Sequence, residues 1–227
     1  MEKKSGLGVR LVEAFFYLHG RLPLTYHHCW ARILAWLLKD VFRYRADVVT
    51  VNLSRSFPDR DYREIAAIRD RFYVHLARTV TEMVWFGACR GEKGRKRFYD
   101  SHIVEFTNPE EWNRLCAANP QRMMLQAHTG NWELIGGIVQ TSHTLPLDIE
   151  ASRISVTYLR QHSALWDSVM AWNRTAPVHD LDFHGYIEAG EVLRFALEHR
   201  DSPFTHLLIT DQAPYRGGGM ELEFMHQ

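Results

Sequence analysis

Cysteine is scarce in this sequence, and its spacing argues against the usual disulfide and zinc frameworks. The three cysteines, Cys29, Cys89 and Cys116, are an odd number, form no CxxC pair and have no cluster of metal-type histidines nearby. Because disulfide-stabilised domains carry paired cysteines and belong to oxidising compartments, we expect free thiols and a reducing compartment. We also expect no metal site.

A long apolar run is lacking as well. The most apolar region, residues 11–42, is interrupted by charged residues, histidines, a glycine and a proline, whereas a membrane span needs about 18 or more apolar residues in succession. The amino terminus has no apolar stretch that ends in a small-residue cleavage site, so we expect no signal peptide and a cytoplasmic protein.

The same region contains two short amphipathic stretches, residues 9–18 and 29–42. Both combine aromatic and basic side chains, which is typical of segments that lie in a membrane interface with rings at headgroup level. Packing of their apolar faces on the domain core is the alternative.

Several enzyme signatures are also missing. The sequence contains no GxSxG elbow, no Walker phosphate loop, no GxGxxG and no HExxH. Their absence argues against the commonest serine hydrolases, nucleotide-binding enzymes and zinc proteases.

Net charge is zero, but the charges are unevenly distributed. Residues 1–100 carry 19 Lys and Arg against 11 Asp and Glu, a net charge of +8, and residues 101–227 carry the compensating −8. A basic, aromatic-rich half suits an anionic surface such as phospholipid headgroups, although a solvated basic face is the alternative. We therefore expect a membrane surface, and no nucleic acid, as a partner.

Length and composition predict a single domain over residues 1–227. Residues 1–100 are expected to form a helical, membrane-associating part. Apolar residues at helical spacing predict a long helix over residues 59–85, capped by Asp61. The glycine-punctuated basic run at residues 90–97 is interpreted as a loop.

From residue 101 onward, short apolar runs alternate with helical segments. We expect strands at residues 103–106, 122–127, 145–151 and 206–210, and helices at residues 109–118, 133–140, 163–172 and 187–198. Strands separated by helices indicate βαβ units, so the predicted fold class is α/β, with a largely parallel sheet flanked by helices.

The residues best suited to chemistry form the segment His128-Thr-Gly-Asn-Trp-Glu133. Ligands of parallel α/β sheets bind beyond the carboxyl ends of the strands, and His128 follows the strand expected at residues 122–127. The Glu133 carboxylate, in the first turn of the next helix, could accept the ring N–H of His128 and fix its tautomer. The other ring nitrogen would then be a general base, and the nucleophile would come from the substrate, for example a hydroxyl that attacks an activated acyl group.

The turn between these two residues offers further candidates. Gly130 allows close backbone approach, and Asn131 could donate or accept a hydrogen bond, although a structural role fits it equally well. The free N–H groups of the following helix could bind an anionic or developing oxyanion group. We interpret Trp132 as a packing residue.

This segment resembles the His-x-x-x-x-(Asp/Glu) motif of the bacterial lipid A biosynthesis acyltransferases, of the lysophospholipid acyltransferase-like superfamily. Three further blocks resemble this family in the same order: residues 45–58, which contain Asn52-Leu and Phe57-Pro; the helix that ends at Arg174; and Asp211-Gln-Ala-Pro, before a glycine-containing loop. Together the four blocks span nearly all of the chain.

The resemblance implies transfer of a fatty acyl chain from a thioester, usually acyl carrier protein, to a hydroxyl of a lipid A precursor at the cytoplasmic face of the inner membrane, without a bound cofactor or metal. It implies that His128 is the general base and Glu133 its orienting carboxylate. Arg174 would stabilise negative charge, and Asp211 and Gln212 would shape the site.

The sequence departs from the family pattern in two places. Thr175 follows Arg174 where the family usually has glycine, and the sequence ends at Gln227 where family members continue, so we expect the carboxyl-terminal part of the family fold to be missing. Three alternatives stay open: another lipid acceptor such as an aminolipid or lysophospholipid, a thioesterase that uses water, and a noncatalytic membrane-binding fragment.

Overall fold

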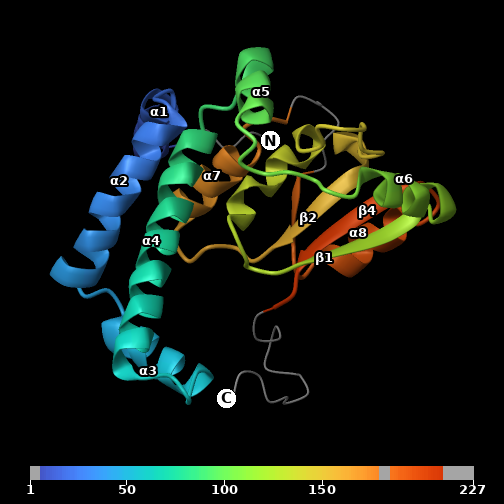
Figure 1. Cartoon of the computed structure of the whole chain (residues 1–227). Coiled ribbons are helices and arrows are strands. Elements are labelled where there is room, and N and C mark those ends of the chain that lie inside the picture. The colour runs from blue at the N-terminus through green and yellow to red at the C-terminus, as the bar shows by residue number, and fades with distance from the viewer. Residues whose placement is uncertain (1–5, 179–184, 212–227) are drawn as a thin grey trace. The chain divides into compact units, whose positions relative to one another are not determined.

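The computed structural model of the protein describes residues 6–178 and 185–211 (Figure 1). Internal contacts divide the chain into two compact units, with boundaries between Leu22 and Pro23 and between Glu82 and Met83. We call described residues 23–82 the helical unit and described residues 6–22 and 83–211 the sheet unit. Each is considered by itself.

A buried cluster of alanines and one tyrosine lies in the helical unit. The unit contains α2 (Leu24–Trp36), the π-helical turn η1 (Leu37–Val41), α3 (Ala46–Ser56) and most of α4 (Tyr62–Phe86). Ala31 and Ala35, one turn apart on α2, pack on Tyr73 and Ala77 of α4, and all four are buried. The Tyr73 hydroxyl donates to the Tyr44 carbonyl at 2.7 Å, so the buried ring keeps a hydrogen-bond partner.

Reciprocal hydrogen bonds open α4. The Glu64 N–H donates to Asp61 Oδ1 at 2.9 Å, and the Asp61 N–H donates to Glu64 Oε2 at 3.1 Å. This capping box satisfies two N–H groups that a helix start otherwise leaves without partners. The long helix and its cap at Asp61 are therefore confirmed.

Helices surround the sheet in the sheet unit. They are α1 (Leu7–Gly20), α5 (Gly91–Asp100), α6 (Pro109–Ala118), the 3₁₀ segments η2 (Trp132–Gln140) and η3 (Ala151–Arg153), α7 (Ala164–Arg174) and α8 (Val192–Glu198). α1 packs on α7, where Val9 and Phe16 share a buried cluster with Val169.

The sheet has four parallel strands. They are β1 (Gln121–Gln126), β2 (Ile154–Tyr158), β3 (Tyr186–Glu188) and β4 (Phe204–Ile209), in the order β1-β4-β2-β3 (Figure 1). β4 pairs with two strands and is buried from Phe204 to Leu207, as expected for a central strand of a covered parallel sheet. The predicted fold class, α/β with a parallel sheet flanked by helices and preceded by a helical section, is confirmed.

Several element predictions are confirmed, and others are wrong. The helices expected at residues 109–118 and 163–172 and the strands expected at 122–127 and 206–210 are present within two residues of their predicted bounds. Residues 133–140 form a 3₁₀ rather than an α-helix, and the segment at 187–198 begins as β3 before it becomes α8. Residues 103–106 and 145–151 form no strand.

Residues 90–97 are mostly helical, so their interpretation as a loop is wrong. Tertiary contacts offset the free-energy cost of placing glycine in helix α5. Phe98 is buried, and Gly94 packs so closely that a Cβ there would lie 2.4 Å from the Cys89 backbone. Arg97 donates to the carbonyls of Gly20 and Leu22 at 2.8 and 2.5 Å. These long-range contacts are not visible in the local sequence.

Residues 145–151 were mistaken for a strand because of their apolar side chains. The Asn113 side chain of α6 donates to the Pro146 carbonyl at 2.8 Å and accepts from the Asp148 N–H at 2.7 Å. Ile149 is buried beside Ile154 and fills the core from a loop. A side chain thus provides the hydrogen bonds that a neighbouring strand would have supplied.

The two amphipathic stretches are helical. Residues 9–18 lie within α1, and residues 29–42 lie mostly within α2 and η1. Among residues 6–178 and 185–211, no helix combines the length and the apolar character needed to cross a membrane.

Candidate active site

A histidine and an aspartate meet at the carboxyl ends of two neighbouring strands. β1 pairs in parallel with β4, with Gln126 opposite Ile209, and extending this register by two residues places His128 opposite Asp211. His128 Nδ1 lies 2.6 Å from Asp211 Oδ1, and the His128 backbone N–H donates to Asp211 Oδ2 at 2.7 Å. The register of β1 and β4 therefore brings His128 and Asp211 together.

The Asp211 carboxylate determines which ring nitrogen of His128 is available. An ionised carboxylate only accepts hydrogen bonds, so in the neutral ring Nδ1 carries the proton and Nε2 keeps its lone pair. The His128 side chain is 26% exposed, which leaves the ring within reach of a substrate. The Trp132 ring packs edge-on at a centroid distance of 4.8 Å and limits ring rotation. The pair has the geometry of a general base with its orienting carboxylate.

Two hydrogen bonds from His128 hold the pKa of Asp211 below its ordinary value of 3.8. The bond from the ring has the larger effect, and the bond from the backbone N–H has the smaller one. Since the folded pKa is the lower one, this carboxylate stabilises the fold above its ordinary pKa, and its contribution is lost as pH falls through the folded pKa.

We expect His128→Ala to raise the pKa of Asp211, because the stronger of the two hydrogen bonds is removed while the backbone N–H stays. Carbon-detected NMR titration of the Asp211 carboxyl group measures this change. His162→Ala, at an exposed histidine between β2 and α7, is the matched control and should leave the titration unchanged. An identical Asp211 titration in the His128→Ala variant and the unmodified protein would exclude the ring as the cause of the lowered pKa.

The carboxylate that was expected to orient His128 binds Arg174 instead. Glu133 Oε2 accepts from Arg174 Nε at 2.6 Å, and Glu133 Oε1 accepts from Arg174 Nη2 at 2.7 Å. The prediction that Glu133 accepts the His128 ring N–H is therefore wrong, and Asp211 has that role. The physical reason is that the His128 ring is already held by a carboxylate from the neighbouring strand, while the guanidinium at the end of α7 requires a negative partner where it is buried.

The Glu133–Arg174 ion pair is largely removed from water. The Arg174 side chain is 16% exposed and the Glu133 side chain 11%. Burial by itself lowers the pKa of Arg174, but the hydrogen bonds and charge of Glu133 outweigh it, so this pKa lies above its ordinary value. The ring of Tyr186 lies 5.7 Å from the guanidinium, and burial raises the pKa of its hydroxyl. Glu133 and Arg174 therefore form a fixed, bidentate ion pair.

Contacts around the last turn of α7 place Arg174. The Arg90 guanidinium lies 3.8 Å from the centroid of the Trp172 ring and donates to the Trp172 carbonyl. The Asn173 side chain donates to the Met83 carbonyl at 3.1 Å. Burial lowers the pKa of Arg90 to about 10, so the group stays charged at neutral pH. The end of α7 is therefore fixed to residues 83–90 of the same unit.

The backbones of η2 and α7 touch at Gly136. A Cβ on this residue would lie 1.7 Å from the Arg174 carbonyl oxygen. We expect Gly136→Ala to lower the free energy of unfolding by about 1–3 kcal/mol, the usual cost of overpacking, and to disturb the ion pair. Gly190→Ala is the control, because nothing lies within 4 Å of a Cβ there. Urea denaturation measures both; equal stability of the two variants would contradict the close approach.

The remaining predicted residues fall in the turn or outside the described chain. Gly130 has a φ of +63°, in the left-handed region that favours glycine, and nothing outside its chain neighbours lies within 4 Å of a Cβ placed on it. Its role is thus to form the turn, and we find no close backbone contact there among the described residues. The Asn131 carbonyl accepts from the Leu134 N–H at 3.2 Å and starts η2. Gln212 lies outside the described residues.

Sequence reasoning placed Asp211 at a strand end but missed its partner. The signal was present, since both His128 and Asp211 come directly after strand segments, but it could be used only once β1 and β4 were known to be neighbours. Tyr186 and Gly136 were missed because nothing in their local sequence indicates contact with Arg174.

Comparisons with known proteins find no family model and no curated protein that matches this chain.

Proposed function

We propose that this protein is an acyltransferase, which transfers a fatty acyl chain from acyl carrier protein or another acyl thioester to a hydroxyl of a lipid A precursor. The observation that carries the proposal is the His128–Asp211 pair, a general base with an orienting carboxylate at the carboxyl edge of a parallel sheet. The four sequence blocks that resemble the lipid A biosynthesis acyltransferases support the choice of reaction.

In the proposed reaction, His128 Nε2 removes the proton from the acceptor hydroxyl as its oxygen attacks the thioester carbonyl carbon. The tetrahedral intermediate collapses with cleavage of the carbon–sulfur bond, and the imidazolium returns the proton to the departing thiolate. Asp211 keeps the ring oriented and stabilises its positive charge in between. Acyl transfer thus needs no nucleophile from the protein.

The Glu133–Arg174 pair is proposed to form a polar wall of the same site. The carboxylate engages Nε and one Nη2 donor of the guanidinium, so the Nη1 donors are proposed to bind a phosphate or the developing oxyanion. Gly130 and Asn131 are proposed to shape the turn between His128 and Glu133. Asp211 acts as the orienting group, and Gln212 remains a candidate from the sequence.

An exposed apolar stripe on α1 supports action at a membrane surface. Leu7, Leu11, Phe15 and Leu18 recur at helical spacing and are 54–75% exposed, next to the exposed cation of Arg10. Large apolar side chains in a helical row beside basic residues suit an interfacial helix. We propose that the sheet unit contacts the cytoplasmic face of the inner membrane through this stripe.

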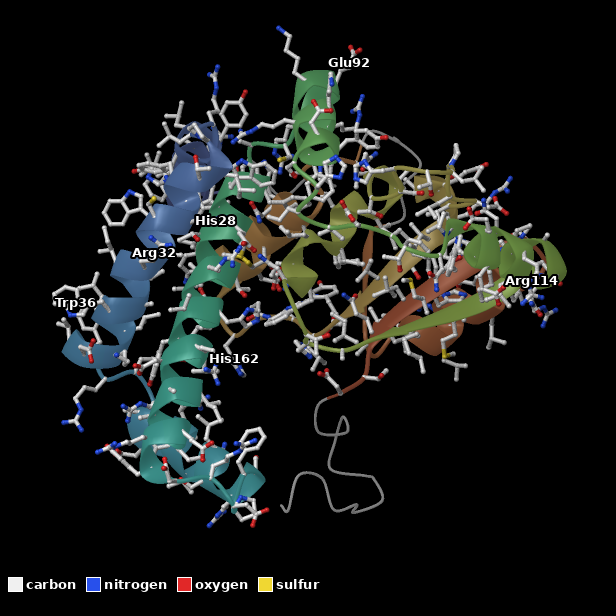
Figure 2. The ribbon with its side chains drawn as sticks, viewed as in Figure 1. His28, Arg32, Trp36, Glu92, Arg114 and His162 are labelled. Atoms are coloured by element: carbon white, nitrogen blue, oxygen red, sulfur yellow. The ribbon has the colours of Figure 1, made fainter. Side chains whose placement is uncertain are left out.

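The helical unit has a comparable face on α2. Trp30, Ile33 and Trp36 are 42–55% exposed, and Arg32 among them is exposed too (Figure 2). Indole rings prefer the headgroup region, and a guanidinium there can bind lipid phosphate. We propose that this face also binds anionic lipid.

The proposal is tested by incubating the protein with acyl carrier protein that carries a labelled acyl chain and with total membrane lipid. We expect label in the lipid fraction, and mass spectrometry of the labelled product then identifies the acceptor. Labelling of an aminolipid or lysophospholipid in place of a lipid A precursor would correct the acceptor and keep the chemistry.

Two other outcomes would replace the proposal. Release of labelled fatty acid with no lipid product would indicate a thioesterase, in which water takes the place of the lipid hydroxyl. Binding to anionic vesicles with neither product, by protein from the complete reading frame, would indicate a noncatalytic membrane-binding protein.

A further inference from the structure

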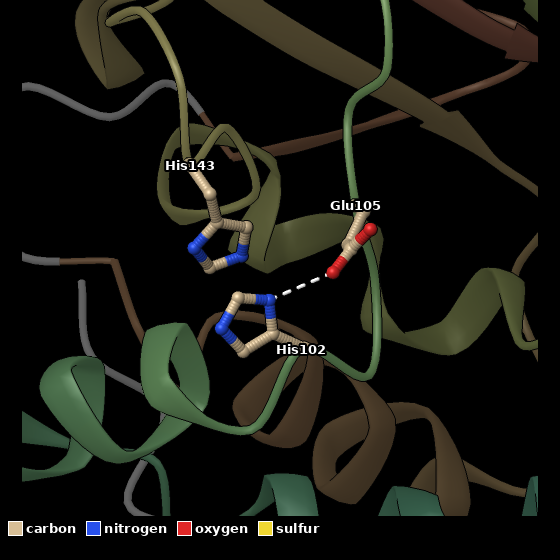
Figure 3. A group of neighbouring side chains, drawn as sticks. All are labelled: His102, Glu105 and His143. Carbon is tan, nitrogen blue, oxygen red and sulfur yellow. Dashed lines mark hydrogen bonds and ion pairs between the residues drawn. The ribbon is translucent and has the colours of Figure 1, made fainter.

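Two histidines and a glutamate meet at the far end of η2 from Glu133. His102, Glu105 and His143 each offer a ligand atom, and these atoms lie within 4.8 Å of one another (Figure 3). His102 Nδ1 lies 2.7 Å from Glu105 Oε1, and the two imidazole rings stack at a centroid distance of 3.9 Å. η2 has nine residues at about 2.0 Å rise each, so this cluster is separate from the His128 site.

The end of α5 turns the chain to form this cluster. His102 follows the cap residue Ser101 and has a φ of +50°, a left-handed conformation that is uncommon for a residue with a side chain. The Ser101 hydroxyl donates to the Phe98 carbonyl at 2.7 Å and accepts from the Ile103 N–H at 3.3 Å. The backbone that carries His102 is thus fixed in an unusual turn.

A backbone hydrogen bond joins the two segments that supply the cluster. The Phe106 N–H, next to Glu105, donates to the carbonyl of Thr141, two residues before His143, at 2.9 Å. The Thr141 hydroxyl donates to the Ile138 carbonyl at 2.6 Å and fixes the end of η2. The three side chains are therefore held near one another by their backbones.

His143 brings a buried nitrogen without a partner. Its ring contacts the Tyr99 ring at a centroid distance of 4.2 Å and stacks on the His102 ring at 3.9 Å. Nε2 is inaccessible to solvent and has no hydrogen-bond partner among the described residues. A buried polar atom that makes no bond costs free energy, so the arrangement favours a ligand that this nitrogen can bind.

We propose that His102, Glu105 and His143 bind a divalent transition-metal ion of the zinc class. Two imidazoles and one carboxylate are a donor set that zinc and its neighbours prefer, whereas magnesium and calcium prefer oxygen ligands throughout. Three protein ligands leave a fourth position for water. The site is independent of the proposed acyl transfer, and its ion fastens the end of η2 to the turn after α5.

Metal binding requires the outermost ligand atoms to come closer and the two stacked imidazole rings, which are 21° from parallel, to turn until both ring planes contain the ion. Tetrahedral zinc with bonds of about 2.0–2.1 Å places its ligand atoms about 3.3 Å apart, so the outermost pair must approach and the His102–Glu105 pair must open slightly. Both of these side chains are more than half exposed, at 55% and 54%, and can adjust their rotamers.

Zinc ion itself is the probe. The full chain is treated with chelator and dialysed, and zinc binding is then followed by isothermal titration calorimetry and native mass spectrometry. We expect one ion per chain and a higher Tm with zinc than with chelator. His143→Ala and Glu105→Gln should each weaken zinc binding by at least about tenfold. Each variant removes a proposed ligand, and the loss of a residue that only supports a ligand already costs about 10–100-fold in affinity. His162→Ala, at an exposed histidine outside the cluster (Figure 2), should bind zinc as the unmodified protein does.

The exposed position of Glu105 makes Glu105→Gln the safer variant for folding, and circular dichroism with chelator present verifies it. The absorption spectrum of the protein with cobalt in place of zinc identifies the donor atoms. A thiolate ligand such as Cys29 would add a charge-transfer band that nitrogen and oxygen donors lack. Three results would each overturn the proposal. They are no zinc binding by the unmodified protein, the same zinc affinity in Glu105→Gln as in the unmodified protein, and a thiolate band in the cobalt spectrum. Acyl transfer is assayed separately, so failure of the metal site and of the proposed function remain distinguishable.

Discussion

His128→Ala should lower the rate of acyl transfer by about 10²–10⁴-fold, the range that a positioned general base contributes. The acceptor hydroxyl would then have to lose its proton to water during attack on the thioester. Alanine fills less space than imidazole at a side chain that is 26% exposed, so the fold should persist. Initial rates of label transfer to membrane lipid, with thermal unfolding measured in parallel, check both expectations.

His162→Ala is the matched control for this loss. It removes an exposed imidazole from the same unit and should transfer label at the unmodified rate. Asp211→Asn should lower kcat more than it raises KM, since the carboxylate acts on the base and not on the acceptor. Full activity in His128→Ala would refute the assignment of the base.

The largest stability effect is expected at the Glu133–Arg174 pair. Glu133→Gln leaves a buried guanidinium without its counter-charge, and Arg174→Met leaves a buried carboxylate alone, so each should lower the free energy of unfolding by about 3–5 kcal/mol. The double variant should be more stable than the sum of the two losses predicts, because both charges are gone. Urea unfolding of the three variants gives the coupling energy directly.

The exposed pair Glu111–Arg114 is a close control for that cycle. It has the same bidentate geometry, with distances of 2.9 and 2.6 Å, but its side chains are 52% and 68% exposed. Water and salt screen such a pair, so its coupling should be at most about 1 kcal/mol. Equal coupling in the two pairs would show that burial does not give the Glu133–Arg174 pair its strength.

The sequence predicts elements well where the signal is local. Asp61 caps α4, and Pro109 and Ser163 mark the starts of α6 and α7, because cap chemistry and helical spacing lie within a few residues. α5 was missed since its stability comes from Arg97 and Phe98, whose partners are distant in the sequence. Residues 145–151 were misassigned because Asn113, also distant, provides their hydrogen bonds.

The same limit applies to the candidate site. His128 could be selected from its motif, and Arg174 from the helix that it ends, but their carboxylate partners depend on strand order and helix packing. Glu133 was the nearer carboxylate to His128 in sequence, whereas Asp211 is the nearer one in space. The group of His102, Glu105 and His143 could not be found from the sequence for the same reason, since His143 is remote in sequence from the other two.

The pairing of β1 with β4 also has a kinetic consequence. His128 and Asp211 are 83 residues apart, and their strands can join only after a long loop has closed. Helices form from local contacts in microseconds or less, while parallel pairings of distant strands are slow. During refolding, helical signal should therefore recover well before His128 acquires the Asp211 carboxylate, so partly folded chains contain the complete segment from His128 to Glu133 without the His128–Asp211 pair.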